Sequence, residues 1–204
     1  MRIKISILGS TGSIGSTTLK IIDKKKNLFS INLLSANKNF GLISKQIKKY
    51  KPKLFVVTNK KIFLKIKKKF INNKTKILED FNKKKLIKSD VVVSSIPGLA
   101  GLEPTLRMIK ISKKILIANK EAIICGWDLI KQSAKKNKTK IIPIDSEHFS
   151  ILKLLEEHRI KDIKKIYITA SGGPFLNYSQ RQLKSITPEH ALRHPKWKMG
   201  KKIS

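Results

Sequence analysis

A glycine-rich turn near the amino terminus has the residue types and spacing to hold a phosphate group. Gly9, Gly12 and Gly15 stand three residues apart, directly after a short apolar run. Glycines allow a tight turn, and the start of a following helix offers free N–H groups and a positive dipole to a pyrophosphate. The spacing is G-x-x-G-x-x-G instead of the commoner G-x-G-x-x-G, so an ordinary glycine turn is the alternative. The order of strand, turn and helix favours dinucleotide binding.

The segment after the second apolar run bears on which dinucleotide fits. An NAD enzyme usually has Asp or Glu about 20 residues beyond the turn, to bind the ribose 2′-hydroxyl. Here Asn37, Lys38 and Asn39 follow the run, and no acid occurs between Phe29 and Phe40. A carboxylate would repel a 2′-phosphate, whereas Lys38 and the amides would accept one. We therefore predict NADP, with the alternative that Lys38 is simply one of many lysines.

Two carboxylates follow a later apolar run. Asp145 and Glu147 come directly after residues 141–144. Alternate side chains of an extended backbone share a face, so this pair could bind one cation, and oxygen ligands suit Mg²⁺ or Mn²⁺ better than Zn²⁺. Alternatively, Asp145 or Ser146 caps the following helix, whose dipole would favour Glu147. From the spacing alone, the cap is the stronger interpretation.

The elements that must position these residues alternate along the chain. Short runs rich in Ile and Val predict buried parallel strands at residues 3–8, 31–36, 54–57, 91–94, 115–118 and 141–144. Apolar residues at helical spacing predict helices at residues 13–24, 40–50, 60–70, 102–111 and 121–137. This alternation predicts a doubly wound α/β sheet with right-handed crossovers.

The pattern changes after Ile144. A helix is expected at residues 145–158 and a strand at residues 163–170, followed by loops that carry glycine, proline and aromatic residues. A second domain is expected to start near Asp145. Its sixty residues make no closed core, so we expect the sequence to be cut within that domain.

The charge and the single cysteine narrow the class of protein. The net charge is +33, but only five of the 46 basic residues are arginine, and Lys, Ile and Asn are all frequent. Mutational drift in an A/T-rich genome explains the high content of Lys, Ile and Asn together, whereas nucleic acid binding would explain only the lysines. We therefore expect no specific nucleic acid partner; a basic nucleic-acid-binding protein is the alternative. Cys125 fits a reducing compartment and a small core position. With neither a signal peptide nor an apolar run of about 20 residues, a bacterial cytoplasmic protein without a membrane partner is expected.

Five segments of the chain together form a recognisable set of motifs. They are residues 8–15 (LGSTGSIG), 118–121 (ANKE), 143–148 (PIDSEH), 171–175 (SGGPF) and 194–200 (HPKWKMG). In their order and at about their spacing, they resemble one enzyme family, 1-deoxy-D-xylulose 5-phosphate reductoisomerase. The resemblance covers the N-terminal half of the family. It implies a Rossmann-like NADP-binding domain over residues 1–144 and the first part of an α+β catalytic domain over residues 145–204. It also shifts the interpretation of Asp145 and Glu147 from a helix cap to metal ligands.

The resemblance implies contacts to NADPH from several segments. They are Thr11, Gly12, Ser13 and Ile14 at the pyrophosphate, Asn37, Lys38 and Asn39 at the 2′-phosphate ribose, Asn119 and Glu121 elsewhere on the cofactor, and Gly200 near the nicotinamide. The family usually has Gly where Asn37 stands, a mild departure because Asn tolerates left-handed backbone geometry.

Substrate and metal contacts are implied in the same way. The cation, Mg²⁺, Mn²⁺ or Co²⁺, would be held by Asp145 and Glu147, and the substrate would contact Lys120, Ser146, Glu147, Ser171 and His194. Of these, Lys120, Glu147 and His194 are the expected catalytic residues. Trp197 and Met199 resemble a mobile flap over the site.

The implied reaction is the NADPH-dependent rearrangement and reduction of 1-deoxy-D-xylulose 5-phosphate to 2-C-methyl-D-erythritol 4-phosphate, a step of isoprenoid-precursor synthesis. The full-length enzyme is expected to be a homodimer. The alternative is a truncated remnant that binds NADP without catalysis.

Overall fold

The structure is a computed structural model that describes residues 1–81, 86–168 and 172–193. Its contacts divide the chain into two units, Met1–Leu154 and Leu155–Ser204, and each is described by itself. The expected domain boundary after Ile144 stays a prediction. Within the described residues, no helix combines the length and the apolar character needed to cross a membrane.

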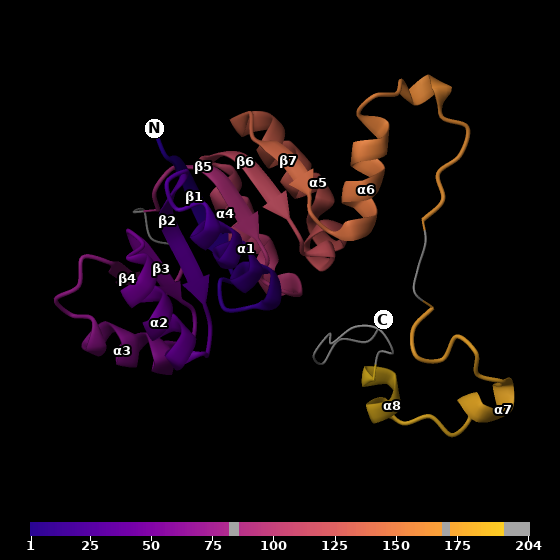
Figure 1. The fold of residues 1–204 in the computed structure, drawn as a ribbon, viewed down its shortest axis with the longest axis horizontal. Helices are drawn as coiled ribbons and strands as arrows, with labels where there is room; N and C mark the ends of the chain where they lie inside the picture. Colours follow the sequence, from indigo (N-terminus) through magenta and orange to yellow (C-terminus); the bar gives the residue numbers. More distant parts are fainter. Residues whose placement is uncertain (82–85, 169–171, 194–204) are drawn as a thin grey trace. The chain divides into compact units, whose positions relative to one another are not determined.

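The first unit is built on a parallel sheet (Figure 1). Its strands are β1 (Ile3–Leu8), β2 (Phe29–Ala36), β3 (Leu54–Val57), β4 (Lys76–Leu78), β5 (Ser89–Ser94), β6 (Ser112–Ile117) and β7 (Lys140–Pro143). They lie in the order β4-β3-β2-β1-β5-β6-β7. All strands are parallel, but the chain adds β2, β3 and β4 on one side of β1 and β5, β6 and β7 on the other, so the strand order reverses between β1 and β5. In such a sheet the crevice beside the carboxyl ends of the strands at the reversal is the usual ligand site.

Helices cover both faces of the sheet. They are α1 (Ser13–Lys24), α2 (Phe40–Tyr50), α3 (Lys60–Lys69), α4 (Leu102–Ile109) and α5 (Lys120–Asn137). The 3-10 turn η1 (Leu99–Gly101) precedes α4, and α6 (Ser146–Leu155) follows β7 and has no buried residue. One buried cluster joins α1, α2 and α3 to one face through side chains such as Leu19, Ile47 and Phe63. A second cluster joins α4 and α5 to the other face through Met108, Ile109 and Ile130. This arrangement confirms the predicted doubly wound, Rossmann-like fold.

The predicted elements of the first unit agree closely with the structure. Two features differ from the predictions, one strand and the burial of one residue. Strand β4 was not predicted, because its three residues lie in a lysine-rich segment and gain their structure by pairing with β3. Cys125 was predicted to be in the core and is exposed. The buried stripe of α5 follows Ala122, Gly126, Ile130 and Ala134, and Cys125 lies beside that stripe instead of on it.

The second unit contains the 3-10 turn η2 (Ile160–Asp162) and the short helices α7 (Gln180–Leu183) and α8 (Pro188–Leu192). Both short helices begin with capping boxes, formed by Ser179 and Thr187. The strand predicted at residues 163–170 is wrong for residues 163–168, which form no strand. A strand needs a neighbouring strand to pair with, and the described part of this unit contains none. The side chains of Tyr167 and Ile168 are therefore left 77% and 66% exposed.

Candidate functional site

The turn between β1 and α1 requires glycine for two separate reasons. Gly9 has a φ of +81°, and a Cβ there would lie 2.9 Å from the Ser95 carbonyl oxygen. A Cβ on Gly15 would lie 2.3 Å from the Gly9 carbonyl oxygen, because the first turn of α1 packs directly against the loop. The glycine spacing therefore follows from close packing of the loop, strand and helix.

Buried polar side chains attach this turn to the neighbouring elements. The Ser10 backbone N–H donates to the Ser35 carbonyl (2.7 Å), and the Gly9 N–H donates to Ser35 Oγ (3.0 Å). Ser10 Oγ donates to Gln46 Oε1 on α2 (2.6 Å), and Gln46 Nε2 returns a bond to the Ser10 carbonyl (2.9 Å). Ser35 and Gln46 were not predicted to be part of the site. The available signals were a glutamine on the apolar face of a helix and a serine inside an apolar strand, since such buried polar residues often hold a neighbouring loop in place.

The start of α1 is open to solvent. Gly12 is its N-cap and makes no side-chain cap, and the first turn holds no acid. Thr11 is half-buried, whereas Gly12, Ser13 and Ile14 are exposed. The first N–H groups of a helix lack partners within the helix and attract anions. The four predicted pyrophosphate contacts thus lie where an anion can reach them.

The end of β2 lies beside this turn, because β1 and β2 are adjacent parallel strands. Asn37, Lys38 and Asn39 are exposed at this end, as the predicted 2′-phosphate contacts must be. Asn39 has an additional structural role, since its Oδ1 accepts a hydrogen bond from the Leu42 N–H (3.0 Å) and caps α2. Its amide nitrogen is the group that can donate to a phosphate oxygen.

The loop after β5 lies on the other side of the strand-order reversal, next to the glycine turn. Ser95 bonds the Leu8 carbonyl through its N–H (3.0 Å) and its Oγ (2.7 Å), which holds this loop against the glycine turn. This loop was not predicted to be part of the site. The available signal was Pro97-Gly98 shortly after a buried strand, because that dipeptide marks a turn.

Asn119 holds together the loops that follow β5 and β6. Its side chain is buried, donates to the carbonyls of Ile96 (2.5 Å) and Gly98 (2.8 Å), and caps α5 by accepting from the Ala122 N–H (3.1 Å). A cofactor contact by Asn119 would therefore come from its backbone. The half-buried Glu121 follows in the first turn of α5.

The acidic turn lies at the same edge of the sheet, after β7. Asp145 Oδ1 accepts from the His148 N–H (3.1 Å) and lies 2.7 Å from His148 Nδ1, so Asp145 caps α6, which is the alternative that the spacing alone favoured; its role as a metal ligand stays a prediction. Lys120, the first residue of α5, places its Nζ 3.1 Å from Glu147 Oε2 and 3.7 Å from Asp145 Oδ1. Adjacent strands β6 and β7 bring these residues together.

The environment of Glu147 keeps it ionised. A hydrogen bond from its own backbone N–H, one from Ser146 Oγ (2.8 Å) and one from Lys120 lower the pKa of Glu147 to about 2. Carboxylate oxygens are the ligands that Mg²⁺ and Mn²⁺ prefer, so Asp145 and Glu147 fit the predicted cation. Among the described residues, no group of three or more His, Cys, Asp or Glu side chains forms a further candidate metal centre.

Three predicted site residues, Ser171, His194 and Gly200, lie outside the described residues, as do the predicted flap residues Trp197 and Met199. The described site therefore comprises the glycine turn, the end of β2, the loops after β5 and β6, and the acidic turn. We call this side of the sheet the carboxyl edge.

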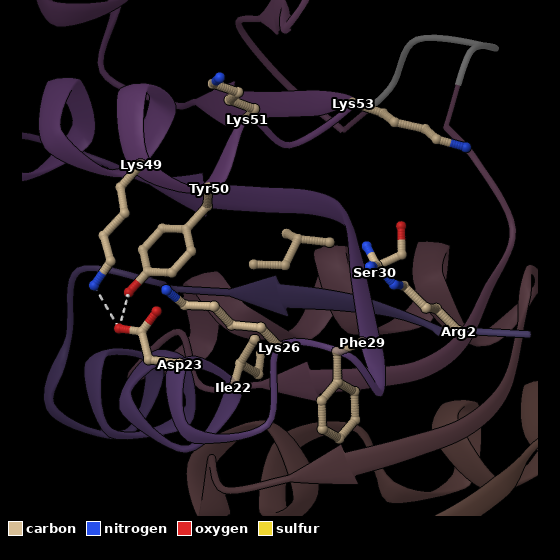
Figure 2. A pocket seen from close by; sticks show the side chains of 11 residues that line it. Arg2, Ile22, Asp23, Lys26, Phe29, Ser30, Lys49, Tyr50, Lys51 and Lys53 are labelled. Atoms are coloured by element: carbon tan, nitrogen blue, oxygen red, sulfur yellow. Dashed lines mark hydrogen bonds and ion pairs between the residues drawn. The ribbon is translucent and has the colours of Figure 1, made fainter.

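A hollow of about 340 Å³ lies at the opposite, amino edge, where β1 and β2 begin and α1 and α2 end (Figure 2). Figure 2 shows Lys49 and Tyr50 converging on Asp23. Lys49 Nζ lies 2.5 Å from the Asp23 carboxylate, and the Tyr50 hydroxyl donates to it (3.0 Å). Lys49 is the main cause of the lowered pKa of Asp23. None of the predicted site residues lines this hollow.

Comparisons with known proteins identify relatives along the whole chain. A family model described as 1-deoxy-D-xylulose 5-phosphate reductoisomerase matches residues 5–126, and a model of that enzyme's C-terminal domain matches residues 141–204. The reductoisomerase of Pelagibacter ubique is 48% identical over 98% of this chain and 53% of its own length. That of Clostridium novyi is 46% identical over 98% of this chain and 54% of its own. The chain spans about half the length of the curated relatives it matches.

Solved structures agree with the sequence relatives. The reductoisomerase of Zymomonas mobilis in complex with NADPH has a TM-score of 0.86 at 28% identity, covering 94% of this chain and 52% of the other. A reductoisomerase in complex with NADPH, fosmidomycin and magnesium has a TM-score of 0.85 at 32% identity, covering 98% of this chain and 53% of the other. The chain therefore belongs to the 1-deoxy-D-xylulose 5-phosphate reductoisomerase family.

Proposed function

We propose that the protein containing this chain converts 1-deoxy-D-xylulose 5-phosphate to 2-C-methyl-D-erythritol 4-phosphate with NADPH and a divalent cation. One observation carries the proposal: an open glycine turn, a strand end without an acid and the carboxylate pair of Asp145 and Glu147 all lie on the carboxyl edge. These are the parts needed for a dinucleotide, its 2′-phosphate and a cation. The proposal is supported by relatives that carry this enzyme's name and by structures solved with NADPH and magnesium.

In this proposal NADPH binds across the strand-order reversal. Thr11, Gly12, Ser13 and Ile14 present the free N–H groups of α1 to the pyrophosphate. Lys38, with the Asn37 and Asn39 amides, neutralises and binds the 2′-phosphate. Asn119 through its backbone, Glu121 and Gly200 complete the predicted contacts. The bound nicotinamide supplies the hydride, and the protein positions it and excludes competing reactions.

Asp145 and Glu147 would hold Mg²⁺, Mn²⁺ or Co²⁺ through carboxylate oxygens. When bound, the cation supplies Lewis-acid polarisation of the substrate's oxygen atoms. Asp145 keeps its orientation through the cap on α6, and Ser146 Oγ holds one oxygen of Glu147. A carboxylate held by its own backbone and a neighbouring hydroxyl needs little reordering to accept a cation.

Substrate contacts are assigned to side chains around this pair. Lys120 and Ser146 lie next to Glu147 and can bind hydroxyl or carbonyl oxygens. We assign Ser171 and His194 to the remaining hydroxyl and phosphate contacts. Two further inferences are that the full-length enzyme is a homodimer in the bacterial cytoplasm and that it has no specific nucleic acid partner. Sedimentation of the complete protein, and binding to a defined hairpin at physiological salt, test them.

The test of the proposed function separates catalysis from cofactor binding. NADPH oxidation is followed with 1-deoxy-D-xylulose 5-phosphate and Mn²⁺, and the Kd for NADPH is measured separately. Glu147→Gln should lower kcat about 100-fold, because misplacement of the reacting groups is that damaging, and should leave the NADPH Kd unchanged. NADPH binding by the wild type without turnover would instead support the alternative, an NADP-binding remnant without catalysis.

A further inference from the structure

Lys120 occupies a defined place between the two candidate metal ligands. It is the first residue of α5, and the Asn119 cap fixes where that helix begins. The Lys120 ammonium lies 3.1 Å from Glu147 Oε2 and 3.7 Å from Asp145 Oδ1. The side chain of Asp145 is only 13% exposed, whereas those of Glu147 and Lys120 are 36% and 40% exposed. The ammonium therefore offsets part of the charge of the carboxylate pair, and its side chain is more exposed than that of Asp145.

Besides the Lys120 ammonium, each of the two carboxylates has a contact with a residue close to it in sequence. Asp145 Oδ1 is also bound by His148, and Glu147 Oε2 also accepts from Ser146 Oγ. These neighbours hold the carboxylates in place whether or not a cation is present. Lys120, by contrast, is attached to them only through its long, flexible side chain, so it can withdraw without disturbing the pair.

We propose that Lys120 is an internal counterion that takes the place of the divalent cation and is released when the cation binds. This inference rests on the proposed function, because it needs Asp145 and Glu147 to bind a cation. An ammonium and a dication compete for the same carboxylate oxygens and repel each other. Once displaced, the Lys120 ammonium is an unpaired positive charge beside the site. It then suits an anionic substrate, so cation binding should precede substrate binding.

A carbodiimide cross-linking experiment tests the release directly. This reagent joins an ammonium and a carboxylate in contact as an amide, and peptide mass spectrometry identifies the joined residues. The Lys120–Glu147 cross-link should form without a divalent cation and fall at least 5-fold with saturating Mg²⁺. The Lys113–Asp90 ion pair, at 2.8 Å on the amino edge, is the matched control and should not change. An unchanged Lys120–Glu147 yield at saturating Mg²⁺ would overturn the inference.

Mn²⁺ binding to variants provides the second measurement, with no substrate present. Lys120→Gln removes the competing charge and should tighten Mn²⁺ binding about 3- to 10-fold, because partly exposed ion pairs are weak. Lys113→Gln changes the net charge equally and should leave Mn²⁺ affinity unchanged.

Glu147→Gln separates the two proposals. Mn²⁺ binding that Glu147→Gln weakens but Lys120→Gln leaves unchanged would overturn the counterion inference and keep the metal site. Mn²⁺ binding that Glu147→Gln does not weaken would overturn the metal site itself, and the counterion inference with it.

Discussion

The two edges of the sheet use polar side chains differently. At the amino edge, acids are paired with nearby donors: Asp23 with Lys49 and Tyr50, and Asp90 with Lys113 and the Lys4 N–H. At the carboxyl edge, buried polar groups such as Asn119 support loops, and the acids Asp145 and Glu147 share the Lys120 ammonium, while the start of α1 and the residues that follow β2 stay exposed. The start of α1 has no side-chain cap, and Lys38 faces solvent.

This difference separates structural charge from candidate binding charge in a chain with a net charge of +33. A lysine count alone does not distinguish a ligand contact from a solvated surface. Position does, because only the carboxyl edge combines a helix start, a strand-order reversal and loops held at fixed positions. We therefore expect substitutions at the carboxyl edge to change binding, and those at the amino edge to change stability slightly.

The largest effect is expected from Gly15→Ala. The added methyl group would meet the Gly9 carbonyl at 2.3 Å, so the turn must shift and overpacking should lower the free energy of unfolding by about 3 kcal/mol. NADPH affinity should fall with it. Gly41→Ala on α2 is the control, because its nearest neighbour would be 3.8 Å away. Urea unfolding and NADPH titration of both variants measure the effect; equal stability of Gly15→Ala and wild type would contradict the close packing.

Asn119→Ala should have the next largest effect. It removes the cap of α5 and two bonds to the loop after β5, so the free energy of unfolding should fall by about 2 kcal/mol. Ser133→Ala, at a half-buried position of the same helix, is the control. Thermal unfolding of the two variants decides between a structural and a purely cofactor-binding role. Unchanged stability with weakened NADPH binding would support the second role.

Lys38→Glu should change cofactor preference rather than stability. The introduced carboxylate would repel a 2′-phosphate, so the Kd for NADPH should rise on the order of 10-fold, whereas that for NADH should stay the same or fall. Lys45→Glu, at an exposed position of α2, changes the net charge equally and serves as the control. Equal Kd values for NADPH and NADH in the wild type would contradict the predicted preference.

Asp90→Asn at the amino edge should have the smallest effect, below about 1 kcal/mol at pH 7, because ion pairs near the surface are weak. Lys113, and then the Lys4 N–H, lower the pKa of Asp90. A lowered carboxyl pKa stabilises the fold above the group's ordinary pKa, and that contribution disappears as the pH falls through the lowered value. The difference between wild type and variant should therefore shrink below about pH 4. A difference that grows with acid would show the opposite sign.

Much of the fold could be predicted from the sequence, because most elements of the first unit contain their own signals. The apolar runs at β1 and β3 and the helical spacing of α1 and α2 gave bounds that the structure repeats. Elements that depend on a partner could not be predicted. Strand β4 exists through its pairing with β3, and residues 163–168 have strand-like composition without a partner strand in the described part of the chain.

The candidate site was predictable where a motif carries its own chemistry, as at Gly9 and Asp145. The supporting contacts of Gln46 and Ser95 were not, because they join residues far apart in sequence. The same holds for the contact between Lys120 and Glu147, which adjacent strands bring together. Spacing along the chain favoured the Asp145 cap, but it could not show that Asp145 also faces Lys120, because that contact depends on the geometry of the strand end.

The proposed binding of NADPH at the carboxyl edge can be tested by mapping the changes that NADPH causes in backbone amide chemical shifts, because these locate the bound cofactor by residue. We expect the largest shifts at Thr11, Ser13 and Lys38 on the carboxyl edge, and small ones at Asp23 and Lys49. Mn²⁺, added separately, should broaden the signals of Asp145 and Glu147. Shifts concentrated around Asp23 and Lys49 would place the polyanionic cofactor in the basic hollow at the amino edge and contradict the account.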